Sequence, residues 1–346
     1  MPQRKYEIIR FNFTTALHIG NERSDYGSGD AFLQSDALYA AICFSWARLG
    51  KKEWIPTEDH DHNGFIISSL FPFVEHENGF SYFLPKPLLL SEERMVDPSI
   101  DTSSLKALKK IHWIDLPVFE ALAGGNPLPY HKTYYDKGYQ SVKELPKDSQ
   151  GKLIDPVGNQ VMPRVSISRT GNEDTTIYYI DRYYFHERAG LFAFAYFKNE
   201  EIKSRVITAL RLLEDEGIGT DKNVGHGKFI FSMDSLSLNL PHEGEYGVNI
   251  GMYCPRDKQE WQAFSEYGKL NARAGYNLVR RGGWMSEPYN TWRKRSVYMA
   301  QPGGIFKSSG KSSAGKVVNV EPTREGINAG HPVWRNGKSL FLPCKG

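Results

Sequence analysis

Cysteine is scarce in this chain: its 346 residues include three, Cys43, Cys254 and Cys344. They lie far apart and form no CxxC pair, which argues against a disulfide framework or a cysteine-based zinc site and is typical of thiols in a reducing compartment. The N-terminus lacks the apolar core of a signal peptide, and no apolar run approaches the roughly 20 residues of a membrane span. We therefore expect a cytoplasmic protein without a membrane partner.

Motifs of the common enzyme classes are missing as well. No GxSxG, HExxH or cysteine–histidine pairing occurs. Residues 303–312, GGIFKSSGKS, resemble a P-loop, but five residues separate Gly304 from Gly310 where four are required, and no apolar strand leads into the loop. The acidic and histidine-rich residues 58–64 would be adjacent ligands on one loop, which makes a poor metal site. We therefore predict no catalytic residue, no metal and no cofactor.

Strong net charge is also absent. The 43 basic and 40 acidic residues leave a charge of +3 at pH 7, so any binding of nucleic acid must come from a local cluster of cations. Aromatic side chains are plentiful, at 13% of residues, and so are turn formers, with 32 glycines and 19 prolines. This composition indicates many strands and turns. The length predicts two domains, because single cores rarely exceed about 250–300 residues.

The hydrophobic pattern predicts an α+β fold. The expected elements are a strand at 5–17, a helix at 35–50 capped by Ser35, strands at 65–73 and 81–90, a hairpin of two long strands at 175–197, a helix at 201–217 and a strand at 228–236. Without a long insertion at about 100–175, which includes a helix at 102–111, the order is β-α-β-β-α-β. This is the order of the ferredoxin-like unit that RNA-recognition domains share.

A turn-rich linker, residues 238–247, precedes a second and smaller part of the chain. There the pattern predicts a strand at 248–254, a helix at 257–267 and several short strands. We therefore divide the chain into a ferredoxin-like domain at 1–240, with the insertion as a possible thumb, and a second, smaller ferredoxin-like (RRM-like) domain at 241–346.

The most informative stretch is GIGTDKNVGHGKF, residues 217–229, which connects a predicted helix to a predicted strand. A glycine-rich, basic connection is suited to holding an anionic backbone through its own N–H groups. Dinucleotide-binding and P-loop motifs run from strand to loop to helix, so the reversed order disfavours both. We predict that backbone amides, with Lys222, His226 and Lys228, hold RNA. A tight loop at a helix end would explain one or two of the four glycines.

A second candidate is residues 271–316, which hold nine Lys or Arg, one acid and six interleaved aromatic residues. Cations set affinity for a phosphate backbone, and aromatic faces offer platforms for unstacked bases. We predict RNA contacts for five residues here: Arg280, Arg281, Trp284, Arg293 and Lys294. The alternative is a solvated basic face with ordinary core aromatics.

Two weaker candidates complete the set. The polar stretch 162–176 contains Arg164 and Arg169 and is predicted to leave the first domain as a hairpin that lies along a nucleic-acid strand, with a solvated loop as an equal alternative. His18 and His226 have the side-chain chemistry of a general acid and base for RNA cleavage. Each is more simply explained as a packed or backbone-contacting histidine, because nothing in the sequence pairs them.

The order of several segments resembles the RAMP superfamily of CRISPR systems, and in particular the RAMP subunit that caps the guide in type III-A (Csm) effector complexes. The matching segments are 33–50, 71–90, 105–125, 164–197, 217–229 and 293–306. The RNA-recognition signature [K/R]GFGFVxF is absent, so base stacking by that scheme is not implied. The basic segment at 280–311 is richer than this family leads one to expect.

This resemblance implies a non-catalytic subunit that binds the 5′ repeat-derived handle of the CRISPR RNA (crRNA). Its implied partners are the large polymerase/cyclase-like subunit, the backbone RAMP subunit and, indirectly, the target RNA, whose duplex with the guide a thumb helps to distort. By motif position the resemblance places RNA binding at Gly217, Gly219, Lys222, Gly225, His226, Gly227, Lys228, Ser35, Arg164, Ser166 and Arg169. The alternatives are a metal-independent endoribonuclease of the same fold that processes CRISPR RNA, or the equivalent type III-B subunit.

Overall fold

The computed structural model of the chain describes residues 3–20, 32–56, 64–88, 109–126, 133–136, 138–167, 176–266, 269, 273–286, 289–323 and 331–345. Most of the helix predicted at 102–111, and Arg169 of the predicted RNA-binding set, lie outside these ranges. In the part of the chain that is described, no helix is long and apolar enough to cross a membrane.

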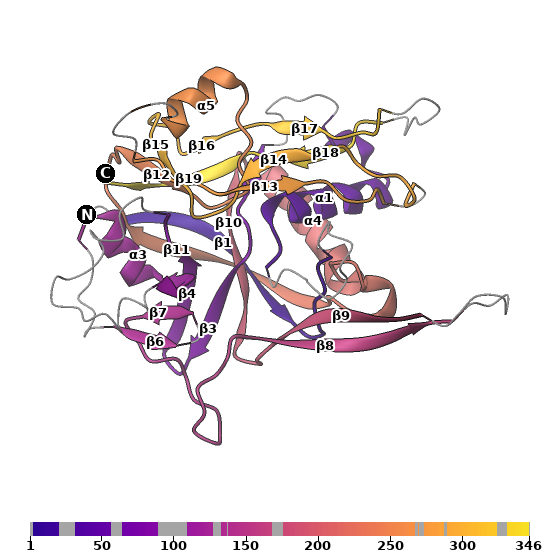
Figure 1. Ribbon diagram of the computed structural model, residues 1–346, viewed down its shortest axis with the longest axis horizontal. Coiled ribbons are helices and arrows are strands. Elements are labelled where there is room, and N and C mark those ends of the chain that lie inside the picture. Colours follow the sequence, from indigo (N-terminus) through magenta and orange to yellow (C-terminus); the bar gives the residue numbers. More distant parts are fainter. Residues whose placement is uncertain are drawn as a thin grey trace.

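The described part of the first 240 residues contains one large sheet with helices on its faces and a separate sheet of two strands (Figure 1). Their elements are β1 (Gln3–Phe13), α1 (Ser35–Arg48), the 3₁₀ turn η1 (Lys52–Trp54), β2 (Phe65–Ile67), β3 (Phe71–His76), β4 (Gly79–Pro85), β5 (Trp113–Asp115), α3 (Leu116–Ala123), β6 (Tyr134–Asp136), β7 (Tyr139–Ser141), β8 (Val157–Ser166), β9 (Thr176–Phe185), β10 (Ala189–Phe197), α4 (Glu200–Glu216), the 3₁₀ turn η4 (Lys222–Val224) and β11 (Phe229–Asn239). The sheet order is β11-β1-β10-β3-β4-β5-β7-β6, and β2 also pairs with β10.

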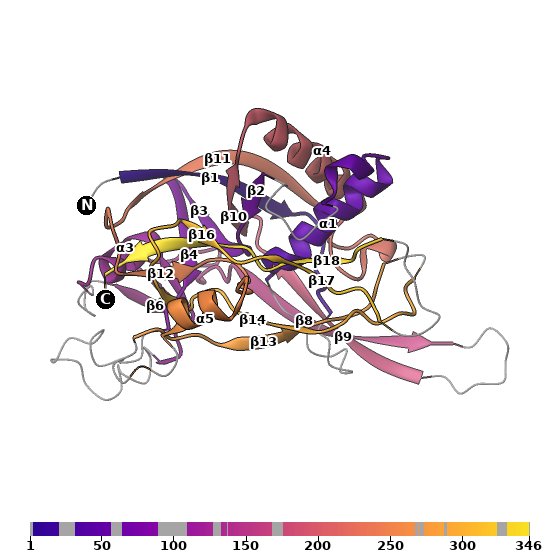
Figure 2. The ribbon, with the colours of Figure 1, turned by 90° about the horizontal axis from the view of Figure 1, so that it is seen from above.

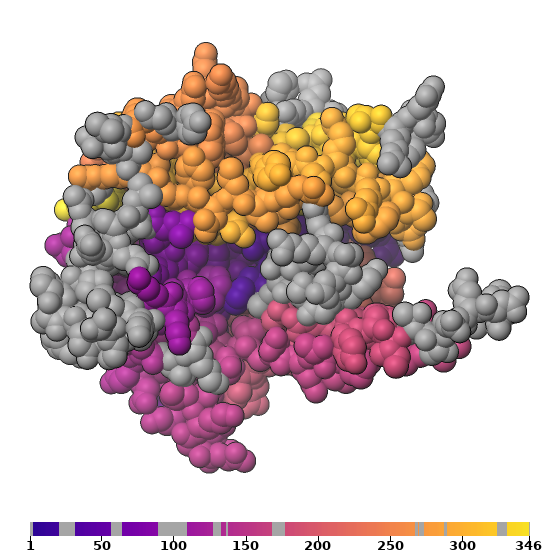
Figure 3. Space-filling view, viewed as in Figure 1, coloured from indigo at the N-terminus to yellow at the C-terminus, as the bar shows by residue number. Residues whose placement is uncertain are grey.

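The remaining residues form a second layer over this sheet, as the space-filling view shows (Figure 3). Their elements are β12 (Tyr246–Asn249), α5 (Lys258–Ser265), β13 (Leu278–Arg281), β14 (Val297–Ala300), β15 (Ile305–Lys307), β16 (Ser313–Ala314), β17 (Val317–Asn319), β18 (Trp334–Asn336) and β19 (Ser339–Cys344). Four of the strands pair in the order β15-β12-β19-β16, while β13–β14 and β17–β18 are two-stranded. The predicted helix at 257–267 is confirmed by α5.

Alternation along the central strands divides the core between the two faces of the large sheet. On one face Ile9 and Phe11 of β1 pack with α1 and α4, and the indole N–H of Trp46 in α1 donates to the carbonyl of Arg205 in α4 at 2.8 Å. On the other face Ile8 lies in a cluster that includes α3 and strands of both layers.

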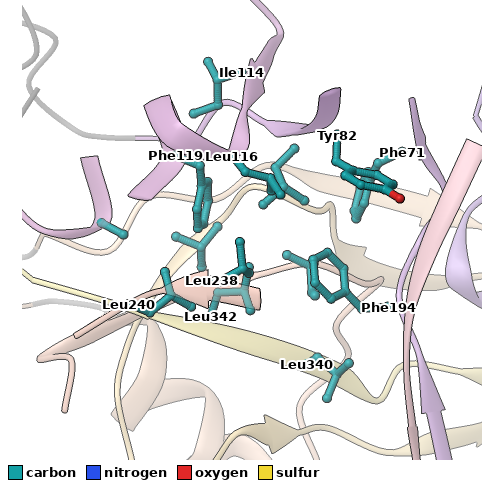
Figure 4. Close-up of a cluster of buried hydrophobic side chains, with 14 of the residues drawn as sticks. Phe71, Tyr82, Ile114, Leu116, Phe119, Phe194, Leu238, Leu240, Leu340 and Leu342 are labelled. Carbon is teal, nitrogen blue, oxygen red and sulfur yellow. The ribbon is translucent and has the colours of Figure 1, made fainter. Parts of the chain in front are cut away.

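This second cluster joins the two parts of the chain (Figure 4). Phe194 of β10 and Leu238 of β11 pack together with Leu340 and Leu342 of β19. The described structure therefore carries a shared apolar core where a sheet of the RNA-recognition type would present a face to RNA.

Two local expectations were wrong, and one helix was not predicted. Strands β9 and β10 do not pair with each other, because β10 is bonded on both edges within the large sheet and β9 pairs with β8 instead. The N-cap of α1 is Gln34 and not the predicted Ser35, whose hydroxyl instead accepts a hydrogen bond from the N–H of Met252 at 2.8 Å. Helix α3 was missed, although Asp115 caps it through the N–H of Val118.

Candidate nucleic-acid interface

The glycine loop, residues 217–228, connects α4 to β11. All four of its glycines have positive φ angles, between 73° and 105°. A Cβ atom would meet a backbone oxygen at 2.4 Å on Gly217, at 2.5 Å on Gly219 and at 1.8 Å on Gly227, while on Gly225 it would meet nothing within 4 Å. Three of the four glycines are therefore required by close backbone packing inside the protein.

Many of the N–H groups of this loop donate hydrogen bonds within the protein. Gly217 donates to Leu213, Ile218 donates to Gly227, and Gly227 donates to Ala16, at 2.8 to 3.0 Å. Further donations from Thr220, Gly225, His226 and Lys228 also end on protein atoms. Because these amides already donate within the protein, an anion at this loop would depend on side chains and on the remaining N–H groups.

Side chains on the outer rim of the loop are open to solvent. Val224 is 58% exposed, Gly225 and Lys228 are exposed, and Lys222 is half-buried with its ammonium 4.8 Å from the ring centre of Phe44 in α1. The predicted cations of the loop thus lie at an accessible surface.

Behind this rim the loop contacts the β8–β9 strand pair through charged side chains. Arg164 of β8 pairs with Asp221 at 3.0 Å. Burial lowers the pKa of His226, the nearby guanidinium of Arg182 adds to the shift, and Asp221 opposes it. Neither Nδ1 of His226 nor Nε of Arg182 has a hydrogen-bond partner among the described residues. The corner between loop and ribbon therefore carries a ring nitrogen and a guanidinium nitrogen without described partners, beside the cations Arg164 and Arg182, a chemistry that suits a phosphate.

The second histidine of the cleavage alternative lies next to this corner. His18 contributes to the lowered pKa of His226, so the fold brings together two histidines that the sequence did not pair. Its side chain is 4% exposed, and its Nδ1 lies 2.6 Å from the carbonyl oxygen of Asp181. A buried ring engaged in this way is placed to support the backbone of β9 rather than to reach a polynucleotide.

Strands β8 and β9 form a ribbon that projects from the body (Figures 1 and 2). The facing pair Val165 and Ile177 is 51% and 61% exposed, and Tyr179, opposite Pro163, is 55% exposed. Ser166 ends β8 at the surface. The described arms of the expected hairpin at 162–176 are thus paired, while residues 168–175 lie outside the described ranges. The pair has an apolar face that is uncovered within the described chain.

The basic segment divides between buried and exposed roles. Arg281 of β13 makes two hydrogen bonds of 3.0 Å to the carboxylate of Asp36, the second residue of α1, and Arg335 of β18 pairs with the same carboxylate. Asp36 is 1% exposed; burial raises the pKa of this carboxyl, but the two guanidinium groups outweigh burial and hold it below its usual range. Arg281 therefore joins the two layers. Ser35, which precedes Asp36 in the sequence, is fully buried and is closed to RNA.

The other predicted residues of this segment lie nearer the surface. Trp284 is 55% exposed, and the guanidinium of Arg293 lies 4.7 Å from its ring centre. Arg280 of β13 is exposed, and Lys294 is half-buried. Two of the six aromatics are ordinary core, since Phe306 is fully buried and Tyr276 stacks on it at 5.4 Å.

Two stretches of the sequence resemble a nucleotide site or a metal site, namely residues 303–312 and 58–64. Neither forms a recognisable cofactor site among the described residues. The P-loop-like stretch runs from β15 to β16 without a helix, and its outer part helps to line a cavity of about 480 Å³ together with Arg4 and Phe264. Within the described ranges no three His, Cys, Asp or Glu side chains are grouped to hold a metal, while most of residues 58–64 lie outside those ranges.

Two comparisons of the sequence with known proteins find the same kind of relative. Residues 242–344 match the family model of the CRISPR Csm4 C-terminal domain. The CRISPR system Cms protein Csm4 of Thermococcus onnurineus (strain NA1) is 24% identical over 287 residues, which cover 80% of this chain and 82% of the relative.

Solved structures extend the similarity to nearly the whole chain. A chain of the Csm1–Csm4 cassette in complex with AMPPNP matches with a TM-score of 0.59 at 17% identity, covering 99% of this chain and 98% of that one. A chain of the Csm3–Csm4 subcomplex in the type III-A CRISPR-Cas interference complex matches with a TM-score of 0.60 at 18% identity, covering 97% and 99%. The mixed α+β fold is therefore the fold of those chains.

Proposed function

We propose, from the premise that this chain is a Csm4-type RAMP subunit of a type III-A CRISPR effector complex, that it binds the 5′ repeat-derived handle of the crRNA without cleaving it. The observation that carries the proposal is the corner where Lys222 and Lys228 border the glycine loop and Arg164, Arg182 and His226 gather behind it. Side-chain cations there replace the occupied backbone amides as the groups that contact phosphates.

The strand order supports a ferredoxin-like fold for the first domain. The first four strands of the sheet order, β11-β1-β10-β3, are the fourth, first, third and second strands of a β-α-β-β-α-β unit, and α1 and α4 cover one face. The family match that begins at residue 242 supports a boundary between 1–240 and 241–346. The projecting β8–β9 ribbon is the segment of the insertion that we propose as the thumb.

The partners follow from the relatives. Related chains have been solved with Csm1 and with Csm3, and we infer that this chain contacts the corresponding large subunit and backbone RAMP subunit of its own complex. The apolar face of the ribbon and the basic surface near Trp284 are available for such contacts.

The glycine-loop cations should set the salt dependence of handle binding. Replacing Lys222 and Lys228 together by glutamine should reduce the slope of log affinity against log salt by about 1.4, because each phosphate contact to a single strand contributes about 0.7. The measurement is fluorescence anisotropy with a repeat-derived 5′ handle RNA between 50 and 200 mM salt, a range in which such slopes are resolved.

A matched control is Lys345→Gln. Lys345 is exposed, and its N–H donates to Ala123 of α3, while α3 also holds Asn239 at the far end of β11. That end lies about 33 Å along the strand from the glycine loop. Equal slopes for the wild type and the double variant would reject phosphate contact at this loop.

Cleavage should be absent. Full-length protein incubated with repeat RNA in EDTA should leave the RNA intact over hours, because His18 is buried against Asp181. Gel analysis of end-labelled RNA reads the result, with His18→Ala and His226→Ala as comparisons. Site-specific products that disappear in either variant would replace the binding proposal by the endoribonuclease.

A further inference from the structure

Strand β11 forms one edge of the large sheet in the described chain. It is 11 residues long and pairs along its whole length with β1, and no described strand pairs with its other side. Just before β11, the N–H of Thr14 donates to the carbonyl of Lys228 at 2.9 Å. The even-numbered residues of β11 therefore make the hydrogen bonds to β1, and the odd-numbered residues direct their N–H and C=O groups outward. An edge of this kind is a template on which a further strand can pair.

Carboxylates accept from the outward N–H groups near both ends of this edge. Near one end the N–H of Phe231 donates to Oε1 of Glu214 at 2.8 Å. At the other end Glu120 accepts twice from Asn239, from the backbone N–H at 2.8 Å and from the side-chain amide at 3.1 Å. A carboxylate is a stronger acceptor for an N–H group than a neutral oxygen is, so these amides are held by the protein itself.

The two glutamates reach the edge from opposite faces of the sheet. Glu214 belongs to α4, which packs on one face, and Glu120 belongs to α3, which packs on the other. Arg211 of α4 pairs with Glu214 at 3.0 Å, and its guanidinium lies 4.7 Å from the ring centre of Phe231. Helices on both sides of the sheet thus extend a side chain around the edge of β11.

The middle of the edge is covered by a side chain of the strand itself. The N–H of Ser235 donates to Oδ1 of Asp234 at 2.7 Å, and the same carboxylate pairs with Arg10 of β1 at 3.2 Å. Three of the five outward N–H groups from residue 231 to residue 239 therefore end on carboxylates. A further strand would have to displace these carboxylates and bury them beside its own carbonyl oxygens, which costs free energy.

We propose that the carboxylates of Glu120, Glu214 and Asp234 close the edge of β11 to strand addition, and that a second copy of this chain pairs there once the two glutamates are removed. Two β11 edges present the same alternation of outward N–H and C=O groups, so they can pair antiparallel about a two-fold axis. The closure keeps the isolated chain a monomer. It does not depend on the RNA binding proposed above.

Glu120→Ala combined with Glu214→Ala opens both ends of the edge. In sedimentation velocity of the full-length protein, the weight-average mass of this double variant should rise with concentration toward about twice the monomer mass or above. The wild type should stay at the monomer mass over the same concentrations. The matched control is Asp215→Ala, which removes an exposed carboxylate of α4 directly beside Glu214 in the sequence and should also stay monomeric.

Ser237→Pro in the double variant separates strand pairing from a general loss of stability. Ser237 is exposed and is one of the odd-numbered residues of β11, so proline removes an outward donor without removing a hydrogen bond to β1. The added proline should return the mass to that of the monomer.

Three results would overturn the proposal. The first is a double variant that stays monomeric, or a wild type that associates to the same extent. The second is association that persists with Ser237→Pro, because it would then come from unfolded chain and not from the edge. The third is a monomeric double variant that no longer binds the large subunit, which would assign the edge of β11 to that partner.

Discussion

Replacing Asp36 by asparagine should destabilise the protein by about 3–5 kcal/mol, the typical cost of removing one partner from a buried ion pair. The carboxylate accepts from Arg281 and Arg335, which belong to two different strands of the second layer, while Asp36 itself lies in α1. Without it, the guanidinium groups of Arg281 and Arg335 lose the buried carboxylate that they share. Urea unfolding at pH 7 measures the loss.

The pH dependence of this loss has a defined sign. The pKa of Asp36 is lower in the folded protein than in the unfolded chain, so the unfolded state binds more protons in acid. The stabilisation is therefore fully present above the unfolded pKa of about 3.9 and is lost as the pH falls through the folded value. The difference in unfolding free energy between wild type and Asp36→Asn should shrink below about pH 4.

Asp234→Asn provides the matched control for this prediction. Asp234 also pairs with an arginine, Arg10, at 3.2 Å, but its side chain is 43% exposed. Exposed pairs typically contribute about 0–1 kcal/mol. If Asp36→Asn unfolds at the same urea concentration as Asp234→Asn, the buried cluster does not hold the two layers together.

Local periodicity predicted most elements of the first domain, because the pattern is set by which side chains face the core. Ile9 and Phe11 do share a buried face of β1, and Val206, Leu210 and Leu213 are buried along α4. The pattern also predicted α5. What it left open is which strands pair, since alternation defines the two faces of a strand and says nothing of its neighbours.

Contacts between distant segments could not be predicted from the sequence either, because a local pattern says nothing of which segments become neighbours. Asp36 is separated from Arg281 by 245 residues and from Arg335 by 299, and no local pattern marks the three as a group. From the sequence alone, Asp36 is only a favourable charge in the first turn of a helix. Helix α3 differs, because Asp115 followed by Leu116 and Pro117 is a local start signal that the prediction did not use.

The glycine loop shows how composition can indicate a site and mislead about its mechanism. Four glycines among lysines and a histidine suggested amides that hold phosphate. In the structure the loop needs glycine because its backbone passes close to itself and to the segment around His18. The composition indicated an accessible bend that carries cationic side chains, and because many of its amides donate within the protein, we expect those side chains to make most of the RNA contacts.

Gly227→Ala should therefore cost far more than Gly225→Ala. Both glycines have positive φ angles, 73° and 85°, so alanine is strained at either position by about 1 kcal/mol. At Gly227 the new Cβ would lie 1.8 Å from the carbonyl oxygen of Ile218, whereas at Gly225 it would meet nothing within 4 Å. The overlap with backbone adds about 2–3 kcal/mol for Gly227→Ala, in the range of overpacked cores.

Denaturant unfolding of the two variants compares these costs directly, and handle binding below the unfolding transition adds a functional readout. Gly227→Ala displaces the Ile218–Gly227 hydrogen bond that closes the loop, so Lys228 at its rim should lose its position and RNA affinity should fall. Gly225→Ala leaves that closure intact and should bind RNA as the wild type does. Similar stability and similar affinity in the two variants would contradict the closed loop, because positive φ alone would then account for both substitutions.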